Sequence, residues 1–147
     1  MINSSPLYKI INGKPDSYKI PKGNVILIGI PAAFSPTCTD KHLPEFAANI
    51  NKLPEHKVVF ISIETPYTMD AWNEKYGHSN IDCVADPLGI FCETLSEISG
   101  TWEDIMGKSC KRFAYLIKDN QIVKKFNSPW FADVHKDITN EDNRSSN

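Results

Sequence analysis

The sequence predicts one α/β domain in which helices cover both faces of a mixed central sheet. Two observations support this prediction: β-branched runs of strand length alternate with segments of helical apolar spacing, and both ends of the domain carry hairpin signals. The 147 residues match the length of one domain, which can bury a core without disulfides. We expect the domain to cover residues 1–138 and the polar residues 139–147 to form a disordered tail.

The first half of the chain contains a hairpin, a strand and a helix. Short apolar runs within Leu7–Ile20 flank Asn12-Gly13, a dipeptide that favours a hairpin turn. Val25–Ile30 is a continuous β-branched run, as in a strand that is buried on both faces. Apolar residues then recur at helical spacing from Thr37 to Leu53. Pro44 should kink this helix because it lacks the backbone donor.

The second half continues the alternation. Its strands are expected over Lys57–Ile63 and Ile81–Ala85, and its helices over Thr68–Tyr76 and Leu88–Ile98, the first ended by Gly77. A closing hairpin joins Phe113–Lys118 to Gln121–Phe126 through Asp119-Asn120. Helices between strands and hairpins at both ends together predict a sheet with parallel and antiparallel neighbours.

Composition and charge exclude several classes of partner. The formal net charge is −2, with 16 basic and 18 acidic residues, so no basic excess drives binding to nucleic acid or to an anionic membrane surface. No apolar run approaches the ~20 residues that span a bilayer, and Met1–Ile10 lack the features of a secretory signal. We therefore expect a cytoplasmic protein with no nucleic-acid partner and no membrane partner.

The four cysteines, at positions 38, 83, 92 and 110, are too far apart to form a C-x-x-C pair. Neither they nor the histidines have the ligand spacing of a structural metal site, so we expect no metal. A disulfide framework is not expected in a domain of this size without a secretory signal. Each cysteine is then either a buried apolar thiol or a reactive one.

Cys38 is the best candidate for a nucleophile. It follows a strand and a proline-rich turn, and it enters the first turn of the expected helix. The free N–H groups and the dipole of a helix N-terminus favour the thiolate form of such a cysteine. Inert packing is the alternative that the position alone leaves open.

The residues around Cys38 sharpen this prediction. Pro31, Ser35 and Cys38 form P-x-x-x-S-x-x-C within the segment GIPAAFSPTCTDKHLPEF over residues 29–46. The segment ADPLGIF over 85–91, Trp72 and the segment KRFA over 111–114 follow in register. From Tyr8 to Phe126 the chain resembles the peroxiredoxins, and within them the type II subfamily. The resemblance implies a thioredoxin-like fold, with which the expected strand order agrees.

The resemblance also implies a thiol-dependent peroxidase of antioxidant defence and redox homeostasis that needs no cofactor. The Cys38 thiolate would attack the terminal oxygen of hydrogen peroxide or of an organic hydroperoxide and become a sulfenic acid. Arg112 would offer a charged fork to thiolate and peroxide, Ser35 a hydroxyl that donates to the peroxide or accepts from it, and Pro31 a shield from water. Without the resemblance, Ser35 is typical of a helix cap, Arg112 of a surface charge and Pro31 of a strand end.

The substrate pocket is expected around the same segment, where backbone N–H groups would complete it and apolar side chains would admit alkyl groups. The residues expected to form it are Thr37, Phe34, Leu43 and Phe46. By resemblance, the chain is expected to pair as a homodimer through the active-site edge, with contributions from Phe34, Pro36 and Phe46.

A sulfenic acid must be resolved by a thiol, and both usual positions of the resolving cysteine lack one. One aligns with Phe60, and the other falls after Phe126, where no cysteine follows. We therefore expect an external thiol, such as glutathione, glutaredoxin or thioredoxin, to complete turnover, while Cys83, Cys92 and Cys110 stay open as resolving partners. Two other functions stay open: a peroxide-sensing redox binding module without significant turnover, and an interaction protein with inert thiols.

Overall fold

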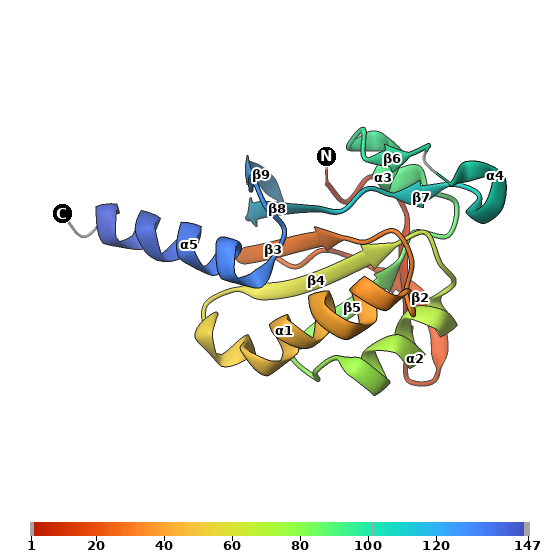
Figure 1. The fold of residues 1–147 in the computed structure, drawn as a ribbon, viewed down its shortest axis with the longest axis horizontal. Helices are drawn as coiled ribbons and strands as arrows, with labels where there is room; N and C mark the ends of the chain where they lie inside the picture. The colour runs from red at the N-terminus through yellow and green to blue at the C-terminus, as the bar shows by residue number, and fades with distance from the viewer. Residues whose placement is uncertain (1, 101, 146–147) are drawn as a thin grey trace.

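The fold is built on a seven-stranded mixed sheet (Figure 1). The computed structural model describes residues 2–100 and 102–145. In spatial order the strands are β2 (Lys14–Tyr18), β1 (Leu7–Ile11), β5 (Ile81–Ala85), β4 (Lys57–Ser62), β3 (Asn24–Gly29), β8 (Phe113–Lys118) and β9 (Gln121–Lys125). The three central strands β5, β4 and β3 run parallel, and the other pairings are antiparallel. The predicted mixed sheet is confirmed.

Both predicted hairpins form, and each turns on two residues in the left-handed region. Asn12 has φ 52° and Gly13 has φ 81° between β1 and β2, while Asp119 has φ 48° and Asn120 has φ 67° between β8 and β9. Two consecutive residues with positive φ match the twist of the flanking strands, and asparagine, aspartate and glycine tolerate this conformation best. The turn residues therefore fix the register of both edges of the sheet.

Helices cover both faces of the sheet, as predicted. Figure 1 shows α1 (Leu43–Ala48) and α2 (Pro66–Tyr76) on one side, and α3 (Ile90–Thr94) and α4 (Glu103–Met106) on the other. Beside α3 and α4 lies a second, two-stranded sheet of β6 (Ile98–Ser99) and β7 (Ser109–Cys110). In the described part of the chain, no helix has the length and apolar character needed to cross a membrane.

The central sheet separates two hydrophobic cores. Alternate residues of β3 point to opposite faces, so Ile26 and Ile28 enter one core, while Val25 and Leu27 enter the other. The first core lies under α1 and α2 and includes Cys38, whereas the second lies under α3 and β7. Cys38 is thus separated by the sheet from the residues of the second core.

The helix predicted from Thr37 to Leu53 is divided into three pieces, so the prediction of one kinked helix is wrong. A π-helical turn, η1 (Cys38–His42), precedes α1, and a 3₁₀ turn, η2 (Ile50–Lys52), follows it. Pro44 lies in the first turn of α1, where its missing N–H leaves no bond unmade. The wider π turn before it accommodates the proline ring, which would clash with the preceding turn of a regular helix.

Two predictions for the second half also need correction. The helix predicted over Leu88–Ile98 stops at Thr94, because Ser96 adopts φ 58° and the chain turns into β6. The residues predicted as a disordered tail continue α5 (Phe131–Ser145), and residues 146–147 lie outside the described part. This helix packs on the core that contains Cys38, through side chains on one of its faces: Phe131, Val134 and Ile138.

Candidate active site

Cys38 lies at the carboxyl end of the parallel strands, the edge at which α/β sheets place their functional groups. It is the first residue of η1, and its side chain has no exposed surface. The next residue, Thr39, accepts a hydrogen bond from the buried Trp72 indole at 3.1 Å. The turn that carries Cys38 is therefore tied to α2 by a bond inside the core.

Arg112 reaches Cys38 although 74 residues separate them in the chain. Its Nη2 donates to the Cys38 Sγ at 3.0 Å, and the residue lies in the short link between β7 and β8. The pairing of β3 with β8 explains the contact, because it places Phe113 opposite Gly29, just before the loop that leads to Cys38. The Phe113 ring occupies the space above Gly29, so a side chain at position 29 would displace the strand end that carries the arginine.

His42 is a member of the site that the sequence did not reveal. It is fully buried, and its Nδ1 lies 2.6 Å from Nη1 of Arg112, while its Nε2 lies 2.8 Å from the Pro129 carbonyl oxygen. Arginine can only donate and a carbonyl can only accept, so Nδ1 is the acceptor and Nε2 carries the proton. Burial, together with the cations of Arg112 and Lys41, lowers the pKa of His42 from 6.5 to about 4, although the hydrogen bond to Pro129 acts in the opposite direction. The neutral imidazole thus holds one Nη of the guanidinium while the other Nη bonds the sulfur.

Trp130 completes the support of the arginine. The Arg112 guanidinium carbon lies 5.1 Å from the centre of the Trp130 ring, and the Lys41 ammonium lies 4.9 Å from it, both within range of a cation–π interaction. The His42 ring packs against the same indole at 4.6 Å between ring centres. Trp130 and Pro129 lie just before α5, beyond Phe126, where the resemblance to the peroxiredoxins ends. Their contribution depends on how the end of the chain folds back, which no local motif indicates.

Ser35 and the turn before it are held by bonds to the backbone. The Ser35 hydroxyl donates to the Ala32 carbonyl at 2.6 Å, which uses its only proton and leaves its oxygen able to accept. Phe34 is 47% exposed. It adopts φ 65°, a backbone conformation that costs a bulky residue free energy. The Glu64 carboxylate accepts a hydrogen bond from the Ala33 backbone, and burial raises the pKa of that carboxyl. Glu64, two residues after the end of β4, thus supports the turn, a role that the sequence did not indicate.

The expected pocket residues lie in different surroundings. Thr37 is exposed at the start of η1, and Pro31 lies half-buried just after β3. Leu43 and Phe46 have no exposed surface and pack in the core under the sheet, so their expected place in a substrate pocket stays a prediction. For the same reason Phe46 offers no surface to a partner subunit. Both side chains instead fill the space beneath the turn that carries Cys38.

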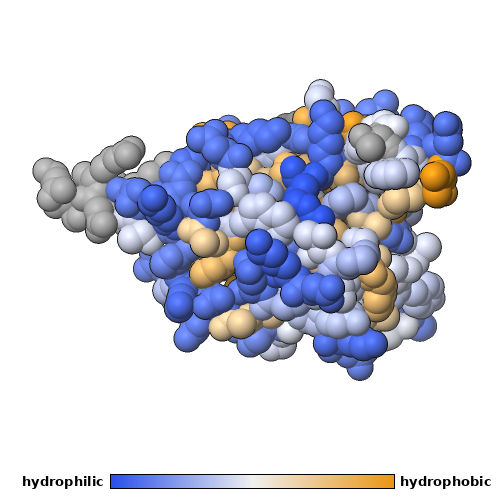
Figure 2. Space-filling view, viewed as in Figure 1, coloured by the Kyte–Doolittle hydropathy of each residue, from blue (hydrophilic) through white to orange (hydrophobic). Residues whose placement is uncertain are grey.

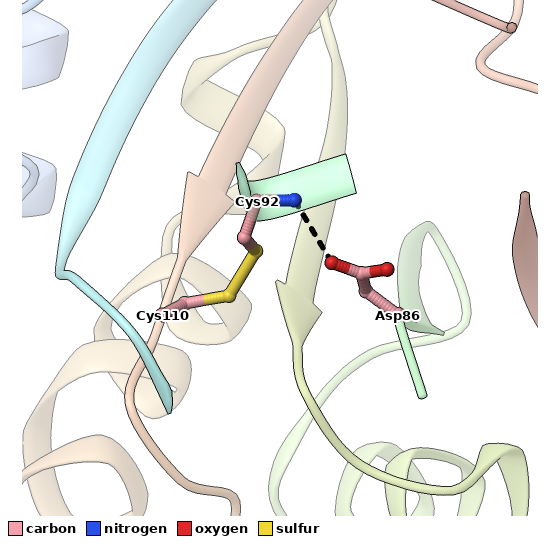
Figure 3. Close-up of side chains that lie close together, drawn as sticks. All are labelled: Asp86, Cys92 and Cys110. Atoms are coloured by element: carbon pink, nitrogen blue, oxygen red, sulfur yellow. Dashed lines mark hydrogen bonds between the residues drawn. A yellow bond between two sulfur atoms is a disulfide. The ribbon is translucent and has the colours of Figure 1, made fainter. Parts of the chain in front are cut away.

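The other three cysteines differ sharply from one another. Cys83 is a free, buried thiol, and burial and the Asp82 carboxylate raise its pKa. Cys92 and Cys110 form a disulfide between α3 and β7, with 6.1 Å between their Cα atoms (Figure 3). The expectation that a domain of this size carries no disulfide is therefore wrong.

The Cys92–Cys110 disulfide is also the place where a metal site would be sought. One ligand atom each of Asp86, Cys92 and Cys110 lies within 4.8 Å of the others, and Figure 3 shows the three side chains close together. The two sulfurs are bonded to each other, so they have no thiolate to offer to a metal. Both oxygens of Asp86 accept backbone N–H groups at the start of α3, from Phe91 at 3.2 Å and from Cys92 at 2.9 Å. The cluster is a disulfide beside a helix cap.

Comparison with known proteins places the chain in a family. The Redoxin family model matches residues 13–138. Hybrid peroxiredoxin hyPrx5 of Haemophilus influenzae is 32% identical over 108 residues, which cover 71% of this chain and 45% of that protein. Peroxiredoxin-2C of Oryza sativa is 33% identical over 100 residues, which cover 65% of this chain and 61% of that protein. The matches thus span between about half and two thirds of the length of these relatives.

Solved structures agree with this placement at the level of the fold. Reduced Prx3 from Vibrio vulnificus, in complex with hydrogen peroxide, superimposes with a TM-score of 0.86 at 18% identity over 93% of this chain and 95% of that one. Peroxiredoxin 5 from Alvinella pompejana gives a TM-score of 0.79 at 21% identity over 95% of each chain. The chain therefore belongs to the Redoxin family, and the predicted resemblance to the peroxiredoxins and the thioredoxin-like fold are confirmed.

Proposed function

We propose that this protein is a thiol-dependent peroxidase that reduces hydrogen peroxide and organic hydroperoxides through Cys38. The observation that supports this most strongly is the 3.0 Å bond from the Arg112 guanidinium to the Cys38 sulfur. A permanent cation that donates to sulfur favours the thiolate, which is the nucleophilic form. The membership of the Redoxin family supports the same chemistry.

The first step is an attack of the Cys38 thiolate on the terminal oxygen of the peroxide. A sulfur–oxygen bond forms, the oxygen–oxygen bond breaks, and the departing oxygen takes a proton and leaves as water or an alcohol. Negative charge spreads over the sulfur and both oxygens as the bond breaks. Donors fixed near these atoms before the reaction stabilise this charge more than the charge of the ground state.

Arg112 and Ser35 are suited to that task in different ways. Two donors of the guanidinium are directed at His42 and Cys38, so the remaining N–H groups can hold the peroxide oxygens. Because the Ser35 proton is used by Ala32, the Ser35 oxygen accepts from the O–H of a hydroperoxide rather than donating to it. Of the two alternatives left open by the sequence, the structure favours acceptance. Pro31 keeps its expected role as a shield beside the turn.

Access to the sulfur requires a small movement of the active-site turn, because the Cys38 side chain has no exposed surface. Pro36 and Thr37, next to it in the chain, are exposed. Phe34 is held with positive φ, so its segment can relax when it moves. We expect peroxide to enter by displacing residues 34–37.

An external thiol then resolves the sulfenic acid. Cys92 and Cys110 are bonded to each other and lie in the other core, while Cys83 is buried with a raised pKa, which disfavours a nucleophilic thiolate. One external thiol displaces water from the Cys38 sulfenic acid to form a mixed disulfide, and a second restores Cys38. Glutathione, glutaredoxin and thioredoxin are the proposed reductants. A cytosolic location stays a prediction.

The chain is further proposed to pair as a homodimer at the edge that carries the active site. Figure 2 shows a mostly hydrophilic surface with separate hydrophobic spots. In the turn before Cys38, Phe34 is 47% exposed and Pro36 is exposed as well. Exposed apolar side chains that gather in one place are typical of interaction surfaces. Phe34→Glu should shift the mass in light scattering from dimer to monomer, whereas Ile122→Glu, at an exposed site on β9, should leave a dimer. A monomeric parent protein would contradict the proposal.

The test of the peroxidase function is steady-state peroxide consumption with glutathione or thioredoxin as the thiol donor. The parent protein and Cys83→Ala should both turn over, and Cys38→Ser should not. A single oxidation of Cys38 without sustained turnover would favour the sensing module instead. Turnover that survives the loss of Cys38 would contradict the proposal.

A further inference from the structure

The Cys92–Cys110 disulfide joins α3 to the strand that leads to Arg112, across an exposed segment of the chain. It closes the segment between α3 and β7, and the residues from 102 to 108 within that segment are all exposed. The two-residue pairing of β6 with β7 is the main backbone attachment of the segment in the described residues. Short, exposed segments of this kind open locally at a low free-energy cost. Thiols in solution therefore have a route to a disulfide that is buried in the closed state.

The two half-cystines are held in place by bonds that do not involve their sulfurs. The backbone N–H of Cys92 donates to the Asp86 carboxylate at 2.9 Å. Cys110 is paired with Ile98 across the small sheet, and the next residue, Lys111, donates its backbone N–H to Glu97 at 2.7 Å. If the sulfur–sulfur bond is broken, these contacts keep the two thiols facing each other. A pair held in this way closes again easily when an oxidant is present.

The disulfide also lies two residues before Arg112. On its carboxyl side Arg112 is fixed by β8, which pairs with β3. On its amino side it is fixed by the β7 pairing and by the covalent bond from Cys110 to α3. Breaking that bond removes one of the restraints on the position of the guanidinium, which lies 3.0 Å from the Cys38 sulfur.

We propose that Cys92 and Cys110 form a second redox centre, distinct from Cys38, which opens and closes by exchange with small thiols and disulfides and thereby tunes the placement of Arg112. The existence of this centre stands without the proposed peroxidase function, whereas its effect on Cys38 rests on that function. The sheet that separates the two cores keeps the two centres apart.

The exchange is a balanced two-electron reaction. A thiolate of an external thiol such as glutathione attacks one sulfur, the Cys92–Cys110 bond breaks, and a mixed disulfide forms while the other cysteine leaves and takes up a proton. A second external thiol attacks the mixed disulfide and leaves as the external disulfide, so that Cys92 and Cys110 are both thiols. The external disulfide reverses the reaction and supplies the oxidising equivalents.

The first test is a redox titration of Cys38→Ser, which cannot react with peroxide at position 38. The folded variant is equilibrated in glutathione buffers of graded ratio, quenched with acid, alkylated under denaturing conditions, and analysed by intact mass. Because Cys83 is the remaining free cysteine, we expect a two-thiol change from one to three alkylatable thiols as the buffer becomes reducing. A bond that persists in the folded protein under excess glutathione, or that never forms, would overturn the proposal. So would stoichiometric binding of zinc by the reduced protein, because it would make the cluster a metal site.

The second test measures the link to Arg112. In Cys92→Ala/Cys110→Ala, which imitates the open state, the single-turnover rate of Cys38 oxidation should fall about tenfold, since positioning effects of this size follow small displacements. The matched control Cys83→Ala removes a buried thiol outside the pair and should react at the parent rate, and thermal unfolding checks that both variants fold. An unchanged rate in the folded double variant would overturn the link. Failure of the parent protein to react with peroxide would instead reject the peroxidase function, and the titration would still decide on the redox centre.

Discussion

Replacing Arg112 by lysine keeps the positive charge but removes the fork that bonds two partners at once. In the structure Nη1 bonds the His42 ring at 2.6 Å and Nη2 bonds the Cys38 sulfur at 3.0 Å. The single ammonium of lysine cannot reproduce both bonds in this geometry. Loss of one bond to a charged group costs about 1.5–3 kcal/mol. If that loss falls on the transition state, the second-order rate of Cys38 oxidation should drop by about 10- to 150-fold.

The assay is single-turnover oxidation of the reduced protein by hydrogen peroxide, in which the remaining Cys38 thiol is alkylated and quantified by mass. The matched control is Lys111→Gln, which removes a cation one residue away whose side chain is exposed. The control should react at the parent rate, because its charge is screened and does not reach the sulfur. A parent-like rate in Arg112→Lys, or an equal loss in Lys111→Gln, would refute the reasoning.

Three further predictions follow from the supports of the arginine. The pKa of His42 is lowered to about 4 in the folded state, so the unfolded chain binds more protons than the folded one between pH 4 and 6.5. The free energy of unfolding should therefore fall by about 3 kcal/mol as the pH drops through that window. Urea unfolding should show this slope in the parent, and a slope that persists in His42→Asn would contradict it. Trp130→Leu should slow single-turnover oxidation by about 2- to 30-fold, because it removes the cation–π contact with Arg112. The control Trp102→Leu changes an exposed indole and should react at the parent rate. Equal rates in the two variants would count against the contribution of the Trp130–Arg112 contact. Gly29→Ala should lower the free energy of unfolding by about 1–3 kcal/mol in urea titrations, because the added methyl group would overlap the Phe113 ring. An unchanged free energy of unfolding would contradict this prediction and show that the start of β8 can shift without cost.

Much of the site could be predicted because its key residues sit in local motifs. Cys38, Ser35 and Pro31 lie within eight residues of one another, and a strand followed by a proline-rich turn marks the place. The two hairpins could be predicted for a similar reason, since their turns need residues that tolerate positive φ. In both cases the signal and the structure occupy the same short stretch of chain.

The parts that escaped prediction depend on contacts distant in the sequence. His42 accepts from Arg112 and donates to Pro129, 87 residues away, and nothing in its own neighbourhood indicates this. Cys92 and Cys110 pair because α3, which carries Cys92, ends at Thr94 and the chain turns back through β6 toward β7, which carries Cys110. The final helix is different, because the spacing of Phe131, Val134 and Ile138 carried a helical signal that the polar residues after it obscured.

The central claim is that an anionic Cys38 sulfur, held by Arg112, breaks an oxygen–oxygen bond. Intact mass measurement after one equivalent of hydrogen peroxide, with each cysteine then mapped, tests it most directly. We predict that the protein gains one oxygen atom, located on Cys38, and that an added thiol removes it. An unmodified Cys38 would contradict the central claim. A loss of two hydrogens that joins Cys38 to another cysteine of the chain would contradict the resolution of the sulfenic acid by an external thiol.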